Sequence, residues 1–233
     1  MRSVCAIELA KPHLDIGLFT NQIEPLLAFW QNDVGLSFEE LLPVGSGVRQ
    51  YRHGANGSVV KLNHAREPLP SAVPPSGYHE LLIARAGLAA PRTLSDSDGN
   101  RITLLPPGNE GIVGIGIRLA VRDLAAFDDF YGRSFGMEPA GPHVFRCGDT
   151  LLFGEQQADA VRGGELRGRG YRYLTVQVRD VEGEHAGLLH RGAEEGRPPV
   201  TLGATARISF VRDPDGNWIE VSQRASLTGP LPG

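Results

Sequence analysis

Two short sequence signatures each occur twice in the chain, in the same order, and this duplication limits the possible folds more than any other feature. An aromatic pair followed by a glycine and an apolar residue occurs at Phe29-Trp30 with Gly35-Leu36 and at Phe130-Tyr131 with Gly136-Met137. A segment that begins Asp-x-Asp-Gly-Asn occurs at residues 96–104 and again at 213–221. The chain is therefore predicted to contain two similar domains, residues 1–110 and 111–233.

The residues around these signatures predict a strand-rich α+β fold. Thirty glycines and seventeen prolines separate short β-branched runs, a pattern typical of short strands joined by turns. The spacing of apolar residues predicts helices at 21–33, 123–135 and 181–193. The two signatures lie 16 residues closer together in the first half, 29 to 96 against 130 to 213. The N-terminal domain is therefore expected to be shortened, with the third helix reduced to residues 85–91.

Charge and composition exclude several classes of function. The formal net charge of -4 argues against a general nucleic-acid binder, because phosphate contacts need a basic surface. No apolar run approaches the roughly 20 residues that cross a bilayer, so no membrane partner is expected. The two cysteines, Cys5 and Cys147, form no disulfide framework, and the N-terminus has no long apolar signal region. A cytoplasmic location is predicted.

With these motifs the sequence resembles the vicinal oxygen chelate superfamily, which includes glyoxalases, bleomycin resistance proteins and extradiol dioxygenases. The aromatic pair followed by glycine matches the opening of a family module, and residues 213–220 match its closing hairpin. The resemblance implies two tandem domains, each built from paired βαβββ modules around a U-shaped sheet. It also implies a small-molecule substrate or ligand on the concave face, commonly a metal there, and in some members a homodimer.

In the C-terminal domain, the family's metal-ligand positions fall on residues that make a poor metal site. They map to Gly116, Leu152, Tyr173 and Glu220, of which only Glu220 is a family ligand type. Because one glutamate and a tyrosine do not hold a divalent ion tightly, Tyr173 is expected to contact the substrate instead. Glu220 stays a candidate metal ligand.

In the N-terminal domain, the same positions map to Asp15, Lys61, His79 and Thr103. A first interpretation places a metal between His79, Asp15 and His13, which shares a strand face with Asp15. Lys61 would then stand close to the cation and repel it.

A second interpretation makes these side chains a metal-free catalytic cluster. His79 would move a proton, Asp15 would orient it, and Lys61 would stabilise oxyanion charge. Asn63, which shares a strand face with Lys61, and Thr103 would contact the substrate.

Two functions remain open at this point. The first, slightly favoured, is an enzyme of lyase, isomerase or dioxygenase type that acts on a small oxygen-rich keto, enol or phenolic metabolite. Such an enzyme would use a divalent metal (Fe, Mn, Zn or Ni) if the histidines and carboxylates bind one. The alternative is a metal-free protein that binds and sequesters a small molecule, as bleomycin resistance proteins do.

Overall fold

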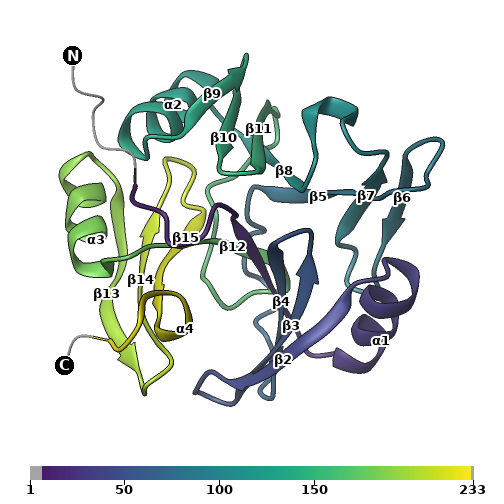
Figure 1. Cartoon of the computed structure of the whole chain (residues 1–233), viewed down its shortest axis with the longest axis horizontal. Helices are drawn as coiled ribbons and strands as arrows, with labels where there is room; N and C mark the ends of the chain where they lie inside the picture. The colour runs from purple at the N-terminus through teal and green to yellow at the C-terminus, as the bar shows by residue number, and fades with distance from the viewer. Residues whose placement is uncertain (1–6, 232–233) are drawn as a thin grey trace.

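The computed structural model describes residues 7–231, which fold into two β-sheets with short helices around them (Figure 1). Cys5 lies outside the described residues, and Cys147 is buried as a free thiol. The first sheet has eight strands, in the order β13-β14-β15-β12-β1-β4-β3-β2, and the second has seven, in the order β6-β7-β5-β8-β11-β10-β9. This arrangement confirms the predicted α+β fold of repeated strand–helix modules.

Each sheet is assembled from two modules. The strands of the first sheet are β1 Asp15–Thr20, β2 Ser37–Pro43, β3 Val48–Ala55, β4 Ser58–Ala65, β12 Gly170–Gln177, β13 Glu194–Leu202, β14 Ala206–Arg212 and β15 Trp218–Arg224. Those of the second sheet are β5 Tyr78–Ala84, β6 Arg92–Ser95, β7 Arg101–Leu105, β8 Ile115–Val121, β9 Glu138–Gly141, β10 Val144–Cys147 and β11 Thr150–Gln156.

The pairing of modules differs from the expectation that each half of the sequence builds its own sheet. The central contact of the first sheet is the antiparallel pair β1–β12, which joins the first module to the last. The corresponding contact of the second sheet is the antiparallel pair β5–β8, which joins the two middle modules. Each sheet therefore contains strands from both sides of residue 110, and the domain boundary proposed there remains a prediction about the sequence repeat.

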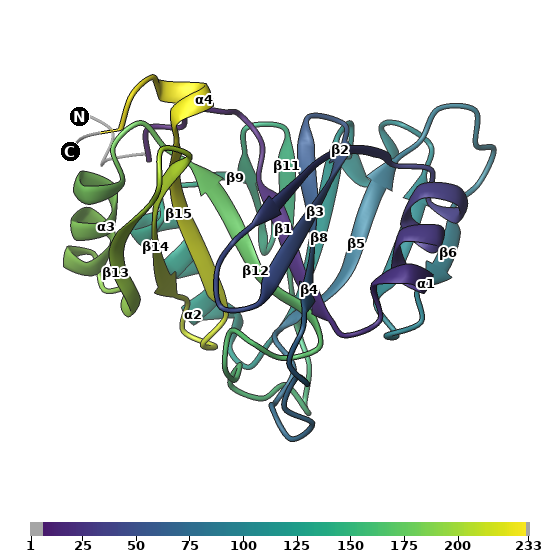
Figure 2. The ribbon, with the colours of Figure 1, turned by 90° about the horizontal axis from the view of Figure 1, so that it is seen from below.

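The three predicted helices are present, each shorter than the apolar spacing suggested. The helical elements are α1 Ile23–Ala28, η1 Phe29–Asp33, η2 Asn109–Gly111, α2 Leu124–Asp128, η3 Asp129–Ser134, α3 Val181–His190 and α4 Ala225–Thr228. The first two predicted helices each consist of an α-helical turn that continues as a π-helix. In the second module, residues 85–91 form a turn and bends where the longest module has α3. The predicted shortening of that module is thus correct. Figure 2 shows α1 and α3 at opposite ends of the molecule.

The repeated signatures correspond to a repeated contact between a helix and a hairpin. The Trp30 Nε1 donates to Asp96 Oδ2 at 3.3 Å, and the Tyr131 hydroxyl donates to Asp213 Oδ2 at 2.9 Å. Each aspartate also accepts backbone N–H groups of its own turn, including that of the asparagine four residues later. The aromatic pair and the Asp-x-Asp-Gly-Asn turn therefore recur together because each half of the chain uses this contact to join its two modules.

The two sheets pack against each other through apolar faces. Alternate residues of β1, including Ile16 and Leu18, share one buried cluster with alternate residues of β5, including Leu81 and Ile83. Side chains alternate along a strand, so the other residues of β1, Gly17 and Phe19 among them, lie on the face turned away from the second sheet. In residues 7–231, no helix has the length and apolar character needed to cross a bilayer.

Candidate functional site

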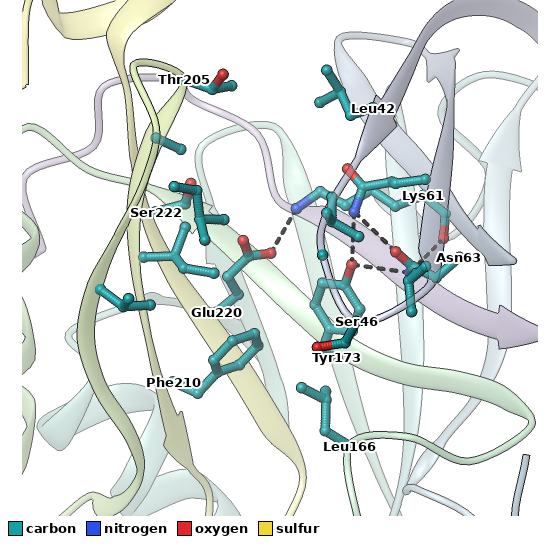
Figure 3. A pocket seen from close by; sticks show the side chains of 18 of the residues that line it. Leu42, Ser46, Lys61, Asn63, Leu166, Tyr173, Thr205, Phe210, Glu220 and Ser222 are labelled. Carbon is teal, nitrogen blue, oxygen red and sulfur yellow. Dashed lines mark hydrogen bonds and ion pairs between the residues drawn. The ribbon is translucent and has the colours of Figure 1, made fainter. Parts of the chain in front are cut away.

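A cleft of about 680 Å³ lies on the outer face of the first sheet. Strands β1, β4, β12 and β15 provide its floor, and the edges of the sheet, β2–β3 on one side and β13–β14 on the other, provide its walls (Figure 3). The lining combines polar side chains such as Lys61, Asn63 and Glu220 with apolar ones, Phe19, Leu166 and Phe210 among them. Because its floor joins the first and last modules, the cleft depends on both halves of the chain.

Lys61 lies at the centre of the floor and pairs with Glu220 across it (Figure 3). Its Nζ lies 2.7 Å from Glu220 Oε2 and 2.6 Å from the Thr175 hydroxyl, which itself donates to the same carboxylate oxygen at 2.7 Å. The side chains of Lys61 and Glu220 are 3% and 11% exposed. Burial lowers the pKa of Lys61, and the neighbouring Glu220 and Asp15 carboxylates partly oppose this effect.

Tyr173 forms the floor next to Lys61, over a glycine that leaves room for its ring. A Cβ atom on Gly17 would lie 2.1 Å from a ring carbon of Tyr173, so a larger residue at position 17 would displace the ring. The Tyr173 hydroxyl accepts hydrogen bonds from Asn63 Nδ2 at 3.1 Å and from Gln50 Nε2 at 3.3 Å. Lys61 Nζ lies 5.3 Å from the ring centroid, within range of a cation–π interaction.

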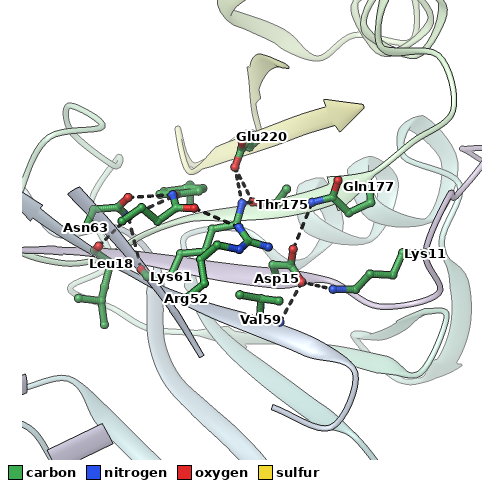
Figure 4. A network of polar contacts seen from close by, with 12 residues as sticks. Lys11, Asp15, Leu18, Arg52, Val59, Lys61, Asn63, Thr175, Gln177 and Glu220 are labelled. Atoms are coloured by element: carbon green, nitrogen blue, oxygen red, sulfur yellow. Dashed lines mark hydrogen bonds and ion pairs between the residues drawn. The ribbon is translucent and has the colours of Figure 1, made fainter. Parts of the chain in front are cut away.

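Asp15 lies beside this network but does not line the cleft (Figure 4). Its carboxylate is buried and accepts hydrogen bonds from Lys11 Nζ at 2.7 Å, the Val59 backbone N–H at 2.9 Å and Gln177 Nε2 at 3.2 Å. These donors satisfy the carboxylate. Its contacts therefore indicate a residue that holds β1, β4 and β12 together at one end of the floor.

Positive charge predominates among the residues that line the cleft. The cationic side chains of the lining are Arg52, Lys61, Arg167, Arg197 and Arg224, and among the described lining residues Glu220 is the one carboxylate. Outside the lining, Glu40 lies 3.6 Å from Arg52 and 3.3 Å from Arg224 and neutralises part of this charge. Burial, followed by the charge of Arg52, lowers the pKa of Arg224. The remaining positive charge favours an anionic ligand.

The residues of the cleft do not fit the divalent metal that the family resemblance implies. The ligand positions on the floor carry Lys61 and Tyr173 beside Glu220, and the Lys61 ammonium, 2.7 Å from Glu220 Oε2, would repel a cation bound there. Among residues 7–231, no three His, Cys, Asp or Glu side chains come together in a way that could hold a metal ion. The predicted ligands Asp15, His79, Glu220 and His13 therefore do not assemble into one site.

The structure separates the predicted cluster of Asp15, Lys61 and His79. His79 lies on β5 in the second sheet, where its Nε2 is 3.2 Å from Glu155 Oε2. Thr103 also lies in that sheet and donates to Glu80 Oε1 at 2.6 Å. The structure does not bring these residues together with Lys61, because β5 pairs with β8 in the second sheet and not with β1.

The remaining predicted residues divide between the cleft and the surface. Tyr173, Asn63 and Glu220 line the cleft with Lys61. His13 does not line it, and its Nδ1 lies 3.8 Å from Asp149 Oδ2.

The outer face of the second sheet combines apolar packing with a network of paired charges. This face carries a separate apolar cluster, formed by Leu82, Ala84, Leu105, Ile112 and Leu151. Next to it, Arg118 pairs with Glu80 at 3.1 Å and also with Glu110 and Glu155. On this face the charged side chains pair with each other and the apolar side chains pack together.

Sequence reasoning missed three polar residues of the first sheet. Gln50 and Arg52 lie on β3 with their side chains in the cleft, and Arg52 donates to Gln50 Oε1 at 3.0 Å. Alternation along β3 could have found both, because Gln50 and Arg52 are two residues apart on one strand face. Alternation along β12 could likewise have found Thr175, which lies two residues after Tyr173 on the same strand face.

Comparisons with known proteins agree with this architecture. Residues 113–221 match the model of the Glyoxalase/Bleomycin resistance protein/Dioxygenase superfamily. A glyoxalase I mutant from Zea mays superposes with a TM-score of 0.71 at 14% sequence identity, over 92% of this chain and 94% of that chain. A putative dioxygenase from Bacillus subtilis superposes with a TM-score of 0.70 at 12% identity, over 94% and 86% of the two chains. No curated protein sequence gives a significant match.

At such low identity the solved structures establish the fold and not the reaction. They cover nearly the full length of the chain, so the four-module arrangement is that of two-domain glyoxalase-type proteins. The sequence match to the family model covers residues 113–221, slightly less than half of the chain. Residues 113–221 therefore match the Glyoxalase/Bleomycin resistance protein/Dioxygenase superfamily, and the chain as a whole has the fold of two-domain glyoxalase-type proteins.

Proposed function

We propose that the chain binds a small, oxygen-rich organic anion in the cleft of the first sheet and does so without a metal. The observation that carries the proposal is the Lys61 ammonium, which lies at a family metal-ligand position and pairs with Glu220 at 2.7 Å. A fixed cation at that position supplies the positive charge that a ligand oxygen would otherwise find in a metal. Because the ammonium is attached to the chain, this charge is present without a bound ion.

The lining supports a ligand with an acidic head and a flat or apolar body. Lys61 and Arg52 offer donors to a carboxylate, enolate or phenolate oxygen. The rings of Phe19, Tyr173 and Phe210 lie around the same floor, with Tyr173 6.3 Å from Phe19 and 6.0 Å from Phe210 between centroids. Aromatic walls with a few convergent polar groups are typical of small-molecule sites. Keto, enol and phenolic acids meet both requirements.

A lyase or isomerase that forms an enolate is the second candidate. It is favoured by the position of the Glu220 carboxylate, which lines the cleft directly beside the Lys61 ammonium. In such a reaction Glu220 would accept a proton from the substrate, and Lys61 would neutralise the oxyanion that forms. His79 and Thr103 lie in the second sheet and take no part in this scheme.

Calorimetric titration of the metal-free protein with a panel of aromatic and 2-oxo carboxylates tests the binding proposal. We expect at least one member to bind, and we expect Lys61→Met to weaken that binding at least tenfold by removing a charge-assisted contact. Arg133→Ala, in an exposed pair on η3, is the control and should bind as the wild type does. Binding that requires added metal, or that survives Lys61→Met, would refute the proposal.

Proton exchange separates a binding protein from an enzyme. Incubation of a bound 2-oxo acid in D₂O, followed by NMR of its C3 protons, reports enolate formation directly. Exchange that Glu220→Gln abolishes supports the enzyme, whereas tight binding without exchange supports sequestration. The cytoplasmic location and the homodimer expected from the sequence remain predictions.

A further inference from the structure

The amine of Lys61 has the surroundings of a nucleophile. Its Nζ is in hydrogen-bond contact with a carboxylate, Glu220, which is held in turn by the Thr175 hydroxyl (Figure 4). A nucleophile, an adjacent base and a third group that orients the base form the arrangement that activates nucleophiles in enzymes. We infer that Lys61 is a carbonyl-reactive amine that forms an imine with an aldehyde or keto group of the ligand. This inference rests on the proposed binding of that ligand in the cleft.

The choice of lysine at this position is unusual for this chain. The sequence contains 23 basic residues of the Lys and Arg types, and two of them are lysines, Lys11 and Lys61, which leaves 21 arginines. Arginine is therefore the residue that the chain uses almost wherever it needs a cation. A guanidinium also pairs well with a carboxylate, but it stays protonated and does not attack carbonyl groups. The lysine at the cleft floor therefore points to chemistry that needs an amine.

The surroundings also make the Lys61 ammonium easier to deprotonate than that of a free lysine, and the reaction needs the neutral amine. The Lys61 side chain is buried, and burial lowers its pKa despite the nearby carboxylates. A neighbouring cation, Arg52, acts in the same direction as burial. Desolvation beside another cationic group is a recognised way of preparing a lysine for imine formation. Glu220 then provides an acceptor for the proton that the amine loses.

The proposed step balances without any additional reagent. The Lys61 ammonium gives one proton to Glu220, and the neutral nitrogen attacks the carbonyl carbon, so that a C–N bond forms and the C=O π bond breaks. One proton of the attacking nitrogen passes to the oxygen, giving a neutral carbinolamine. Glu220 then returns its proton to the hydroxyl group, which leaves as water, and a protonated C=N bond replaces the original C=O bond. No electrons are gained or lost, and the products are one imine and one water molecule.

Reductive trapping tests the inference with the full chain and two probes of different size. Wild-type protein is incubated with formaldehyde or with 4-carboxybenzaldehyde in the presence of sodium cyanoborohydride, and the modified lysines are located by peptide mass mapping. Lys11 is an internal standard, because it pairs with Asp15 at the same 2.7 Å but outside the cleft. We expect 4-carboxybenzaldehyde to label Lys61 at least about ten times faster than Lys11. Preferential labelling of Lys11 by both probes would overturn the inference.

Variants separate a reactive amine from a structural ion pair. Lys61→Arg keeps the cation and should lose all labelling at position 61 while the Lys11 reaction is unchanged. Glu220→Gln removes the adjacent base and should slow labelling of Lys61 by about tenfold, since general bases contribute factors of this size or more. An unchanged Lys61 rate in Glu220→Gln would contradict the assigned role of the carboxylate.

A carbonyl-free analogue keeps this inference distinct from the proposed function. 4-(Hydroxymethyl)benzoate has the acid and ring of the larger probe but no electrophile, and its binding is measured by calorimetry. If this analogue binds through Lys61 while neither probe labels the residue, the amine inference fails and the binding proposal stands. If formaldehyde labels Lys61 first but neither aromatic acid binds, the amine is reactive and the proposed ligand class is wrong.

Discussion

Removing one partner of the Lys61–Glu220 pair should destabilise the protein more than removing both. In Lys61→Met, the Glu220 carboxylate stays in a nearly buried position without its 2.7 Å cation. Breaking a buried pair in this way costs about 3–5 kcal/mol. We expect a value near 3 kcal/mol at the lower end of that range, because Glu220 is 11% exposed and retains the Thr175 hydroxyl as a donor.

The double variant Lys61→Met/Glu220→Leu removes both charges and replaces them with apolar groups. Such replacements are commonly neutral or stabilising, so the double variant should lie within about 1 kcal/mol of the wild type. The coupling energy between the two positions should therefore be at least about 2 kcal/mol. For a chain of this size, the single variant should also unfold about 6–12 °C lower.

Urea unfolding followed by tryptophan fluorescence and by circular dichroism measures these values. Coincident transitions from the two signals justify a two-state treatment. The exposed pair of Arg133 and Asp129 is the control, and Arg133→Ala should leave the midpoint unchanged. If Lys61→Met and the double variant have the same stability, the pair is not coupled and the account of the cleft floor is wrong.

Three further predictions concern other features of the molecule. Gly17→Ala should cost about 1–3 kcal/mol and weaken ligand binding, because its Cβ would lie 2.1 Å from the Tyr173 ring; unchanged melting and affinity would show that the ring can move freely. Burial lowers the pKa of His53 to about 4, so the unfolded state binds the proton first on acidification. The wild type should therefore lose stability relative to His53→Gln between about pH 6.5 and 4, by at most about 1.4 kcal/mol per pH unit, and parallel pH profiles would argue against this. Prolonged dialysis against a chelator should lower the melting temperature by less than about 2 °C, whereas a larger loss that zinc or iron restores would reveal a stabilising metal.

The fold could be predicted from the sequence because its signal is local and repeated. Trp30 contacts Asp96 within the first half of the chain. Tyr131 contacts Asp213 within the second half. A helix and a hairpin that fix each other leave the same residue types in the same order in both halves. The repeat therefore shows where modules begin and end.

The composition of the site could not be predicted, because it depends on which modules share a sheet. Strand β1 could have paired with β5 or with β12, and the alternation of its side chains is the same in both cases. Pairing with β12 brings Tyr173 and Glu220 to Lys61 and leaves His79 in the other sheet. Long-range strand pairing of this kind has no local sequence signal.

The pairing of the first and last modules also determines when the cleft can form during synthesis. Strands β5, β8 and β11 lie within residues 78–156 and can associate while the ribosome is still translating the rest. Strand β1 emerges first, yet its antiparallel neighbour β12 begins at Gly170 and the floor strand β15 ends at Arg224. One edge of β1 therefore stays unpaired until most of the chain has been synthesised. Open strand edges are sites of aggregation. A prematurely terminated product would expose this edge without ever completing the cleft.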